Sequence, residues 1–495
     1  MTPRTQTSPA ADSPRTPECP RAPECPREPE WTEEGAVLLV SCYELGRQPL
    51  GAAAPLAFLR RAGFRPAAMD VAAEPFSGEK VLRARLLCVS VPMHTALRLG
   101  LAAARRAREM NPGCHICFFG LYALLNASFL LENGGDSCLG GEAEASLVAL
   151  AGALAGGHPL EGVPGLALKG RAGRPLLEKL PWPAPSREGL PPLASYARLA
   201  RDGELLLAGA VEASRGCKHL CLHCPIPPVY GGRFFAVPRE TVLEDVRRLA
   251  AQGARHLTFA DPDFLNGPSH SLRVARAVNA EFPGLTFDFT AKVSHLVKHR
   301  DLLPELARLG GLFAVSAVES LNDRLLGILD KGHTREDVFE ALAACRAAGL
   351  SLRPSLLAFT PWTSAGDYFE LLDFIEEERL QDEVDPVQMA IRLLIPPGSA
   401  LLGRPDLAPH LLELDQENFV HRWAHPDPRM DRLHEEALSL AEEAAAHDED
   451  PALTFARLRA LAARILEMPG RAGSSLGALP PDRARPPRLT ESWFC

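Results

Sequence analysis

Short apolar runs alternate with longer amphipathic segments from about residue 36 onward. The run at residues 37–41 is continuously apolar up to its final Ser41, as in a parallel strand buried on both faces. An apolar segment stopped by Gly63 predicts a helix, and an Ala/Arg/Leu-rich segment over residues 95–110 predicts a longer one. Further strands are expected at residues 65–71, 86–91 and 115–120. This order predicts a flavodoxin-like α/β domain over residues 35–155, with ligands at the carboxyl ends of its strands.

The alternation of strand and helix resumes near residue 205 and continues to about residue 402. We predict strands at residues 205–212, 256–260, 286–290, 312–318, 351–358 and 387–394. Six such β/α units fit a partial TIM-type barrel, (β/α)6, over residues 205–405. Helical patterns predict an extension over residues 406–468. The Pro- and Gly-rich segment 156–204 predicts a hairpin and a linker between the two α/β parts.

Both ends of the chain differ in composition from its middle. Residues 1–34 are rich in proline, contain the near-repeat Pro-Glu-Cys-Pro-Arg and have almost no large apolar residues, so we expect them to be disordered. Cys19 and Cys25 lie in this repeat, and we favour solvated tail cysteines over metal ligands. Residues 469–495 return to Gly, Pro and Arg and predict a flexible tail, although it ends on the unusual sequence Trp-Phe-Cys.

Composition excludes several classes of protein. The chain has 495 residues, of which 46% are hydrophobic and 23% are charged, as in a globular protein of two or three domains. A net charge of −9 without a basic tail argues against general nucleic-acid binding. No apolar run is long enough to span a membrane, and the N-terminus lacks an apolar signal core. Twelve cysteines in a chain of this length do not predict a disulfide scaffold, so we expect a cytoplasmic protein.

Three cysteines with the spacing C-x3-C-x2-C follow the first predicted strand of the barrel. They are Cys217, Cys221 and Cys224. Three thiolates on one loop can hold three irons of a 4Fe–4S cluster and leave the fourth iron open, whereas a closed electron-transfer cluster needs four protein ligands. A zinc site or three unrelated cysteines are the alternatives. Zinc sites usually show paired C-x2-C units or distal histidines, and no second pair follows downstream.

This motif resembles that of the radical S-adenosylmethionine (SAM) superfamily. The resemblance implies that SAM chelates the open iron through its amino and carboxylate groups, and that reductive cleavage of SAM gives a 5′-deoxyadenosyl radical. It also implies an electron donor such as flavodoxin or ferredoxin. The substrate, a small molecule or a peptide, is not named by any motif. A dry barrel mouth would protect the radical.

The resemblance suggests SAM contacts at three places near the loop. His223 occupies a position that is usually aromatic and lies near the adenine, although a solvent-facing histidine fits equally well. Asp261 and Asp263 follow the second strand, where carboxylates can hold the methionyl amine. Both aspartates fit equally well as turn residues that cap the next helix.

Two later strands add further candidates. Glu319 and Ser320 end the fourth strand and, with Lys331-Gly332, resemble a pair common in cobalamin-linked and tRNA-modifying radical SAM proteins. Arg353 on the fifth strand, and Arg392 on the sixth, could meet the SAM carboxylate. Buried arginine is rare unless paired, so a structural pair such as Glu319 with Arg353 is the alternative.

The N-terminal domain resembles the cobalamin-binding domain that precedes many radical SAM cores. The resemblance rests on strand order, on Gly120 and on the Gly-Glu-x-Glu sequence at residues 141–144. Cobalamin domains with a protein ligand to cobalt carry Asp-x-His-x-x-Gly after the first strand, but residues 41–46 here read Ser-Cys-Tyr-Glu-Leu-Gly. Either cobalamin is bound without that histidine, or the domain has lost the cofactor. His94 could face the same crevice, but it is more often a helix-start residue.

Cys114 and Cys117 form C-x2-C at the start of a strand, where we favour small apolar core residues over a redox pair.

The run at residues 392–397 and the end Thr-Glu-Ser-Trp-Phe-Cys resemble radical SAM proteins with a Cys-Cys-Ala-Glu-Pro or Cys-selenocysteine-Ala-Glu-Pro tail. An exposed thiol beside two aromatics invites oxidation and association. We hypothesise that the gene continues after Cys495 through a UGA codon read as selenocysteine.

These features predict a radical SAM enzyme in which bound cobalamin would make methyl transfer the natural reaction. The alternative enzyme is a peptide- or metabolite-modifying radical SAM protein without cobalamin. The alternative outside enzymes is an iron–sulfur or zinc-binding regulatory protein.

Overall fold

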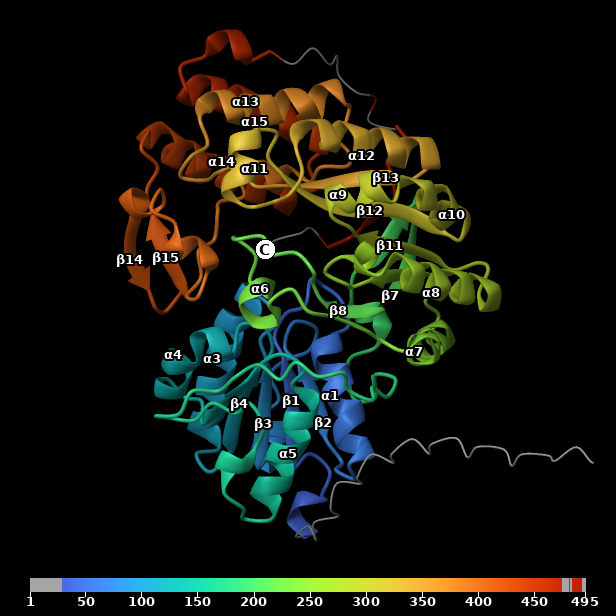
Figure 1. The fold of residues 1–495 in the computed structure, drawn as a ribbon, viewed down its shortest axis with the longest axis vertical. Coiled ribbons are helices and arrows are strands. Elements are labelled where there is room, and N and C mark those ends of the chain that lie inside the picture. The colour runs from blue at the N-terminus through green and yellow to red at the C-terminus, as the bar shows by residue number, and fades with distance from the viewer. Residues whose placement is uncertain (1–28, 474–479, 481–482, 492–495) are drawn as a thin grey trace, which may run out of the picture.

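The computed structural model describes residues 29–473, 480 and 483–491. Figure 1 shows two α/β bodies joined end to end, with C-terminal helices packed over the second body. Predictions that concern residues 1–28 and 492–495, including Cys19, Cys25 and the continuation after Cys495, lie outside the described residues. The short helix Pro29–Trp31 corrects the end of the expected disordered tail, because Trp31 is buried against the first body with Phe64.

The N-terminal body is a five-stranded parallel sheet in the order β2-β1-β3-β4-β5. Its strands are β1 (Val37–Ser41), β2 (Ala67–Asp70), β3 (Leu86–Ser90), β4 (His115–Phe119) and β5 (Ser137–Leu139). Its helices are α1 (Leu50–Arg61), α2 (Gly78–Arg83), α3 (His94–Met110), α4 (Ala127–Glu132) and α5 (Glu144–Ala155). Every residue of β1 and β3 is buried, because helices cover both faces of the sheet. The expected flavodoxin-like order is confirmed.

The second body is a curled, open sheet in the order β13-β12-β11-β10-β7-β6-β16. Its parallel strands are β7 (Glu204–Val211), β10 (His256–Phe259), β11 (Thr286–Thr290), β12 (Gly311–Glu319) and β13 (Ser351–Leu356). The helices that follow these strands are α7 (Arg239–Ala251), α8 (Pro268–Glu281), α9 (Val293–Lys298), α10 (Leu303–Arg308), α11 (Asp323–Ile328), α12 (Arg335–Ala348) and α13 (Ala365–Glu377). The expected partial barrel is confirmed.

The sixth barrel strand, expected at residues 387–394, is not a regular strand. Residues Pro386–Ala390 form a 3-10 helix, and one parallel bridge joins Phe359 to Arg392. Phe359 N donates to Ile391 O at 2.9 Å, and Leu393 N donates to Phe359 O at 2.8 Å. The buried Val387 and Leu393 explain the apolar pattern, but Pro396 and Pro397 follow directly and cannot extend a ladder.

The segment expected as a linker, residues 156–204, is packed against both bodies. Leu180, Trp182 and Leu193 belong to the core of the barrel. Arg187 is buried and paired with Asp245 at 2.7 Å. Within this segment β6 (Arg198–Arg201) pairs antiparallel with β7 and extends the sheet.

The expected flexible tail also needs correction where the structure describes it. Arg483 bridges Asp382 and Asp450, and β16 (Arg488–Leu489) pairs antiparallel with β6. Tyr43 donates a hydrogen bond to Glu491 at 2.9 Å, so this segment also touches the N-terminal body. Charge pairing and strand addition therefore fix residues whose composition alone predicts no core.

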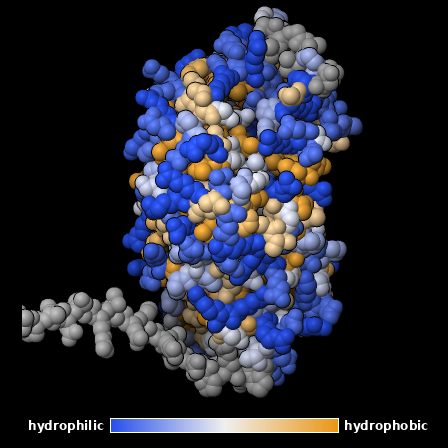
Figure 2. All heavy atoms as spheres, turned by 90° about the vertical axis from the view of Figure 1, so that its right-hand side faces the viewer, coloured by the Kyte–Doolittle hydropathy of each residue, from blue (hydrophilic) through white to orange (hydrophobic). Residues whose placement is uncertain are grey.

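The expected helical extension contains two helices, α14 (Pro428–Ala446) and α15 (Pro451–Ile465). A hairpin of β14 (Leu411–Asp415) and β15 (Val420–Trp423) precedes them. Figure 2 shows hydrophobic residues scattered among hydrophilic ones over one face of the molecule. Among the described residues, none of the helices is long and apolar enough to cross a bilayer.

Candidate functional site

The three cysteines lie on one loop that follows β7 and β8 (Ser214–Gly216) and leads into α6 (Ile226–Tyr230), which Figure 1 shows between the two bodies. Before the loop, β8 pairs with β9 (Phe234–Ala236). Gly216 has φ +72°, and a Cβ there would lie 2.4 Å from Arg233 O. Glycine is therefore required where the chain turns into the loop.

Asp261 fixes the start of this loop. Its carboxylate accepts hydrogen bonds from Ala213 N at 2.9 Å and from the Ser214 hydroxyl. Burial raises the pKa of Asp261 to about 7, against the opposing effect of these hydrogen bonds. Both oxygens thus hold the segment that leads into the loop, which is a structural role other than the expected cap of the next helix.

The thiols are largely enclosed by protein. Cys221 is buried, and Cys217 and Cys224 are partly buried. Burial raises the pKa of the Cys224 thiol to about 12. Lys292 Nζ lies 3.5 Å from Cys221 Sγ and places positive charge beside the thiols. Because iron binds thiolates, this charge and that of the metal both favour the deprotonated ligands.

Glu319 is held at the end of β12 by the side chains of Lys331 and His223. Lys331 Nζ lies 3.1 Å and His223 Nε2 lies 3.2 Å from Glu319 Oε1. Burial raises the pKa of Glu319, but Lys331 and His223 outweigh it and lower the pKa to about 2. Glu319 also has φ +64°, a strained value for a side chain of this kind. The structure therefore brings Glu319, His223 and Lys331 together at the barrel mouth.

Ser320 and Asp263 lie close by but have local partners. Ser320 Oγ accepts a hydrogen bond from Asn322 N at 3.1 Å, as in a turn. Asp263 Oδ1 accepts one from Leu265 N at 3.0 Å, and Asp263 Oδ2 faces His219 and His295. Burial raises the pKa of Asp263, but these two histidines outweigh it and lower the pKa below its usual value.

Arg353 lies away from this group. In the register of the sheet it is opposite Val315, whereas Glu319 is opposite Leu356. The separation of four residues between Val315 and Glu319 corresponds to about 13 Å along the strand. Arg353 instead pairs with Asp385 at 3.3 Å. The alternative of a structural pair for Arg353 therefore agrees with the structure, but its partner is Asp385 and not Glu319.

Arg392 also has structural partners. It pairs with Asp431 at 2.7 Å, and its guanidinium lies 3.5 Å from the centroid of the Trp423 ring. It therefore ties the region of the sixth unit to β15 and α14.

A cavity of about 300 Å³ lies between the two bodies at the carboxyl ends of their strands. We call it the seam cavity. Gly120 and Gly141 line it from the N-terminal body, and Gly216 and Ile226, which flank the cysteine loop, line it from the barrel. The loop thus adjoins the place where an α/β sheet of this topology binds ligands.

Charged residues line the seam cavity, among them Glu44, Glu144, Glu212 and Arg215, and the buried Glu142 lies beside them. The sequence analysis did not single out most of these residues. Arg215 pairs with Glu142, Glu144 and Glu212. Burial raises the pKa of Glu142 to about 7, although Arg215 opposes this, and burial also raises the pKa of Glu44 to about 7. Two features of the sequence could have indicated these charges, namely Gly-Glu-x-Glu at residues 141–144 and Arg215 just before the cysteine loop.

Two other sequence candidates have structural roles. His94 Nε2 lies 2.8 Å from Asn418 O, and His94 does not line the seam cavity. Cys114 and Cys117 are buried in the N-terminal body, where burial raises the pKa of each thiol to about 12. The interpretation of both cysteines as apolar core residues is confirmed.

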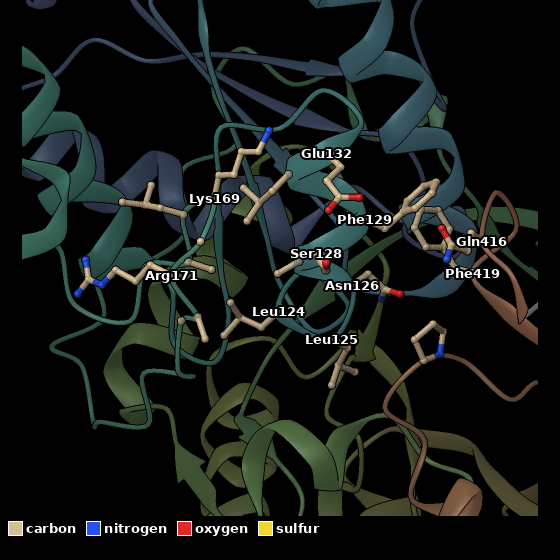
Figure 3. A pocket seen from close by; sticks show the side chains of 18 of the residues that line it. Leu124, Leu125, Asn126, Ser128, Phe129, Glu132, Lys169, Arg171, Gln416 and Phe419 are labelled. Atoms are coloured by element: carbon tan, nitrogen blue, oxygen red, sulfur yellow. The ribbon is translucent and has the colours of Figure 1, made fainter.

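A larger hollow of about 550 Å³ lies between the N-terminal body and the β14–β15 hairpin. In Figure 3, Lys169 and Arg171 lie on one side of it and Gln416 and Phe419 on the other. It shares no lining residue with the seam cavity. It is therefore a separate feature of the surface, away from the cysteine loop.

Residues 211–359, which include the cysteine loop and the mouth of the barrel, match the sequence model of the Radical SAM superfamily. The protein therefore contains a radical SAM domain. Such a domain carries a 4Fe–4S cluster and binds SAM.

One curated relative matches a longer stretch of the chain than this domain. The hopanoid C-3 methylase of Methylococcus capsulatus is 26% identical over 324 residues, which are 64% of this chain and 62% of the methylase. The chain thus spans somewhat less than two thirds of that relative.

Two solved structures share the fold. The cobalamin-dependent SAM radical enzyme OxsB, with aqua-cobalamin and SAM bound, matches with a TM-score of 0.65 and 15% identity over 82% of this chain and 66% of OxsB. The radical SAM methyltransferase TsrM from Kitasatospora setae, with cobalamin and a [4Fe-4S] cluster bound, matches with a TM-score of 0.54 and 18% identity over 69% of this chain and 70% of TsrM. At these identities the likeness concerns the fold.

Proposed function

We propose that the protein is a cobalamin-dependent radical SAM methyltransferase. The observation that carries this proposal is the seam cavity, which joins the cysteine loop to the carboxyl edge of the N-terminal sheet. The names of the methylase and of TsrM support methyl transfer, and the OxsB and TsrM structures hold cobalamin in proteins of the same fold.

The chain's residues suit the iron–sulfur cluster and SAM. Cys217, Cys221 and Cys224 would hold three irons, and Lys292 would offset the charge of the thiolates. Glu319, fixed by Lys331 and His223, would present a carboxylate to the SAM amine or hydroxyls at the barrel mouth. Together the cluster and SAM supply a 5′-deoxyadenosyl radical. Flavodoxin or ferredoxin would supply the electron.

The seam cavity also suits cobalamin, which carries methyl groups when bound. Glu144 Oε2 is buried without a hydrogen-bond partner among the described residues, and Glu144 lines the cavity. The amide groups at the rim of a corrin ring are donors of the kind this oxygen lacks. No histidine is among the described residues that line the cavity. Bound cobalamin should therefore show an absorption spectrum without protein imidazole on cobalt.

Cobalamin titration tests the proposal. Leu121 lines the seam cavity, so Leu121→Trp should fill part of it and weaken cobalamin binding at least tenfold. Leu99→Trp is the matched control, because Leu99 is 46% exposed on α3 and outside the cavity. Binding is followed by absorption at equilibrium. No binding by the unaltered protein, or equal loss in both variants, would overturn the assignment of the seam cavity to cobalamin.

A further inference from the structure

Two imidazoles and a carboxylate meet beside the cysteine loop. His219 lies between the first two cysteines of the loop, Asp263 follows β10, and His295 lies in α9. Asp263 Oδ2 is 3.4 Å from His219 Nε2 and 2.7 Å from His295 Nδ1. The three atoms all lie within 4.8 Å of one another. Potential metal ligands from three segments of the barrel thus lie close together.

These three atoms approach closely without hydrogen bonding. Each is buried, and none has a hydrogen-bond partner of acceptable geometry among the described residues. Since buried polar atoms are nearly always hydrogen-bonded, three exceptions at one point need a common explanation. The ring nitrogens lie 3.4 and 2.7 Å from the carboxylate oxygen without meeting the geometry of a hydrogen bond. Ligands around a metal ion behave in this way, because each is aimed at the ion.

The spacing of the atoms also suits an ion. With metal–ligand bonds of about 2.1 Å, the pairs that are 2.7 and 3.4 Å apart would subtend angles of about 80° and about 108° at the ion. The first angle is closer to the octahedral value and the second to the tetrahedral value. The hydrogen bond from Leu265 N to Asp263 Oδ1 orients the carboxylate, as the outer partners of metal ligands do.

We propose that His219, Asp263 and His295 bind one divalent transition-metal ion, separate from the iron–sulfur cluster. Two imidazoles and one carboxylate suit Zn²⁺ or Fe²⁺, and three protein ligands leave a coordination position open. The side chain of His219 is 24% exposed, although its Nε2 is buried with the other two ligand atoms. The ion would fasten the cysteine loop to the segments that follow β10 and β11, and it would occupy the Asp263 carboxylate, for which a SAM contact was one of two interpretations of the sequence.

Metal analysis of the untagged holoenzyme tests the proposal directly. The protein is dialysed against Zn²⁺, and zinc is counted separately from iron by elemental mass spectrometry. We expect about one zinc per chain, with nitrogen and oxygen ligands at about 2.0–2.1 Å in zinc-edge X-ray absorption. A sulfur shell at about 2.3 Å would place the zinc on cysteines and overturn the proposal. Competition with Fe²⁺ under anaerobic conditions then decides which of the two metals binds more tightly.

Variants locate the metal and separate this proposal from the proposed function. The background is full-length protein with Cys217, Cys221 and Cys224 changed to Ala, which lacks cluster ligands but should bind Zn²⁺ and melt at a higher temperature with it. Adding Asp263→Asn or His295→Gln should weaken Zn²⁺ binding at least tenfold. His299→Gln is the matched control, since its ring lies 5.7 Å from that of His295 but outside the ligand group, and it should bind as the background does. No binding by the background, or an equal loss with His299→Gln, would overturn the proposal.

Discussion

The partner of each charged residue at the barrel mouth depends on the position of that residue along its strand. Glu319 has Lys331 as its partner, twelve residues later in the chain, because α11 and the turn after it bring Lys331 back to the end of β12. Glu319 and Lys331 were both visible in the sequence as parts of a family pattern. A buried carboxylate such as that of Glu319 also needs a charged or hydrogen-bonding partner. The sequence analysis could not exclude Arg353, because the register of two parallel strands is not visible in either strand alone.

The first prediction concerns Glu319→Gln. The change leaves Lys331 buried without a counter-charge, so we expect a loss of about 3 kcal/mol in the free energy of unfolding. Glu336→Gln is the control, since Glu336 is exposed in the next helix and should change stability by less than about 0.5 kcal/mol. Urea unfolding at pH 7, on protein without the cluster, measures both. Equal stability of the two variants would contradict this account of the barrel mouth.

The second prediction is the pH dependence of that difference. The pKa of Glu319 is lowered from 4.5 to about 2 in the folded protein. A lowered pKa means that the unfolded chain binds the proton more readily, so the stabilisation is complete above pH 4.5 and is lost as the pH falls toward 2. The stability gap between the unaltered protein and Glu319→Gln should therefore narrow between pH 6 and pH 3. A gap that stays constant or widens over this range would show that Glu319 is not held as a carboxylate.

At the scale of elements, long apolar strands were predictable and short edge strands were not. β1, β3, β4 and β12 carry continuous apolar runs, and the predicted positions agree with the structure. β5 and β16 have three and two residues, too few for a pattern. Their place in the fold depends on tertiary contacts, namely pairing with β4 and with β6. The prediction of a sixth strand was wrong although its apolar pattern is present, because a buried apolar run need not be a strand.

The third prediction compares two glycines near and within α5. Gly141 has φ +73°, and a Cβ there would lie 2.2 Å from Leu176 O. Gly141→Ala should therefore destabilise the protein by about 2 kcal/mol or more. Gly152 lies inside α5, where an added Cβ would have no neighbouring atom within 4 Å, so Gly152→Ala should stabilise by about 0.5–1 kcal/mol. Thermal unfolding measures both, and the same sign for both changes would contradict the description of this loop.

The fourth prediction concerns the attachment of β16. Arg483 is paired with Asp382, which follows α13, and with Asp450, which precedes α15, and the Arg483 side chain is 12% exposed. Arg483→Gln should release the segment and speed amide hydrogen exchange in β6 at least tenfold, because Arg198 N donates to Thr490 Oγ1. Arg432→Gln, which removes an exposed pair within α14, is the control and should leave β6 unchanged. Unchanged exchange in both variants would mean that other contacts hold this segment.

At the scale of the whole molecule, the candidate site arises where two α/β bodies meet at the carboxyl ends of their strands. The spacing of Cys217, Cys221 and Cys224 identified the loop from sequence, because all the proposed cluster ligands are local. The seam cavity could not be predicted from sequence, since Gly120 and Gly216 become neighbours only through the packing of two sheets. The histidines facing Asp263 were missed for the same reason. Local motifs thus revealed the chemistry of the radical SAM domain, and tertiary structure placed it beside the N-terminal domain.

The most direct test of the central claim is reductive SAM cleavage by the reconstituted protein. Under anaerobic conditions, protein holding about four irons per cluster should convert SAM to 5′-deoxyadenosine when a reductant is supplied, with and without added cobalamin. The variant with Cys217, Cys221 and Cys224 changed to Ala should form neither the cluster nor the product. 5′-Deoxyadenosine from that variant, or none from protein with an intact cluster, would contradict the account.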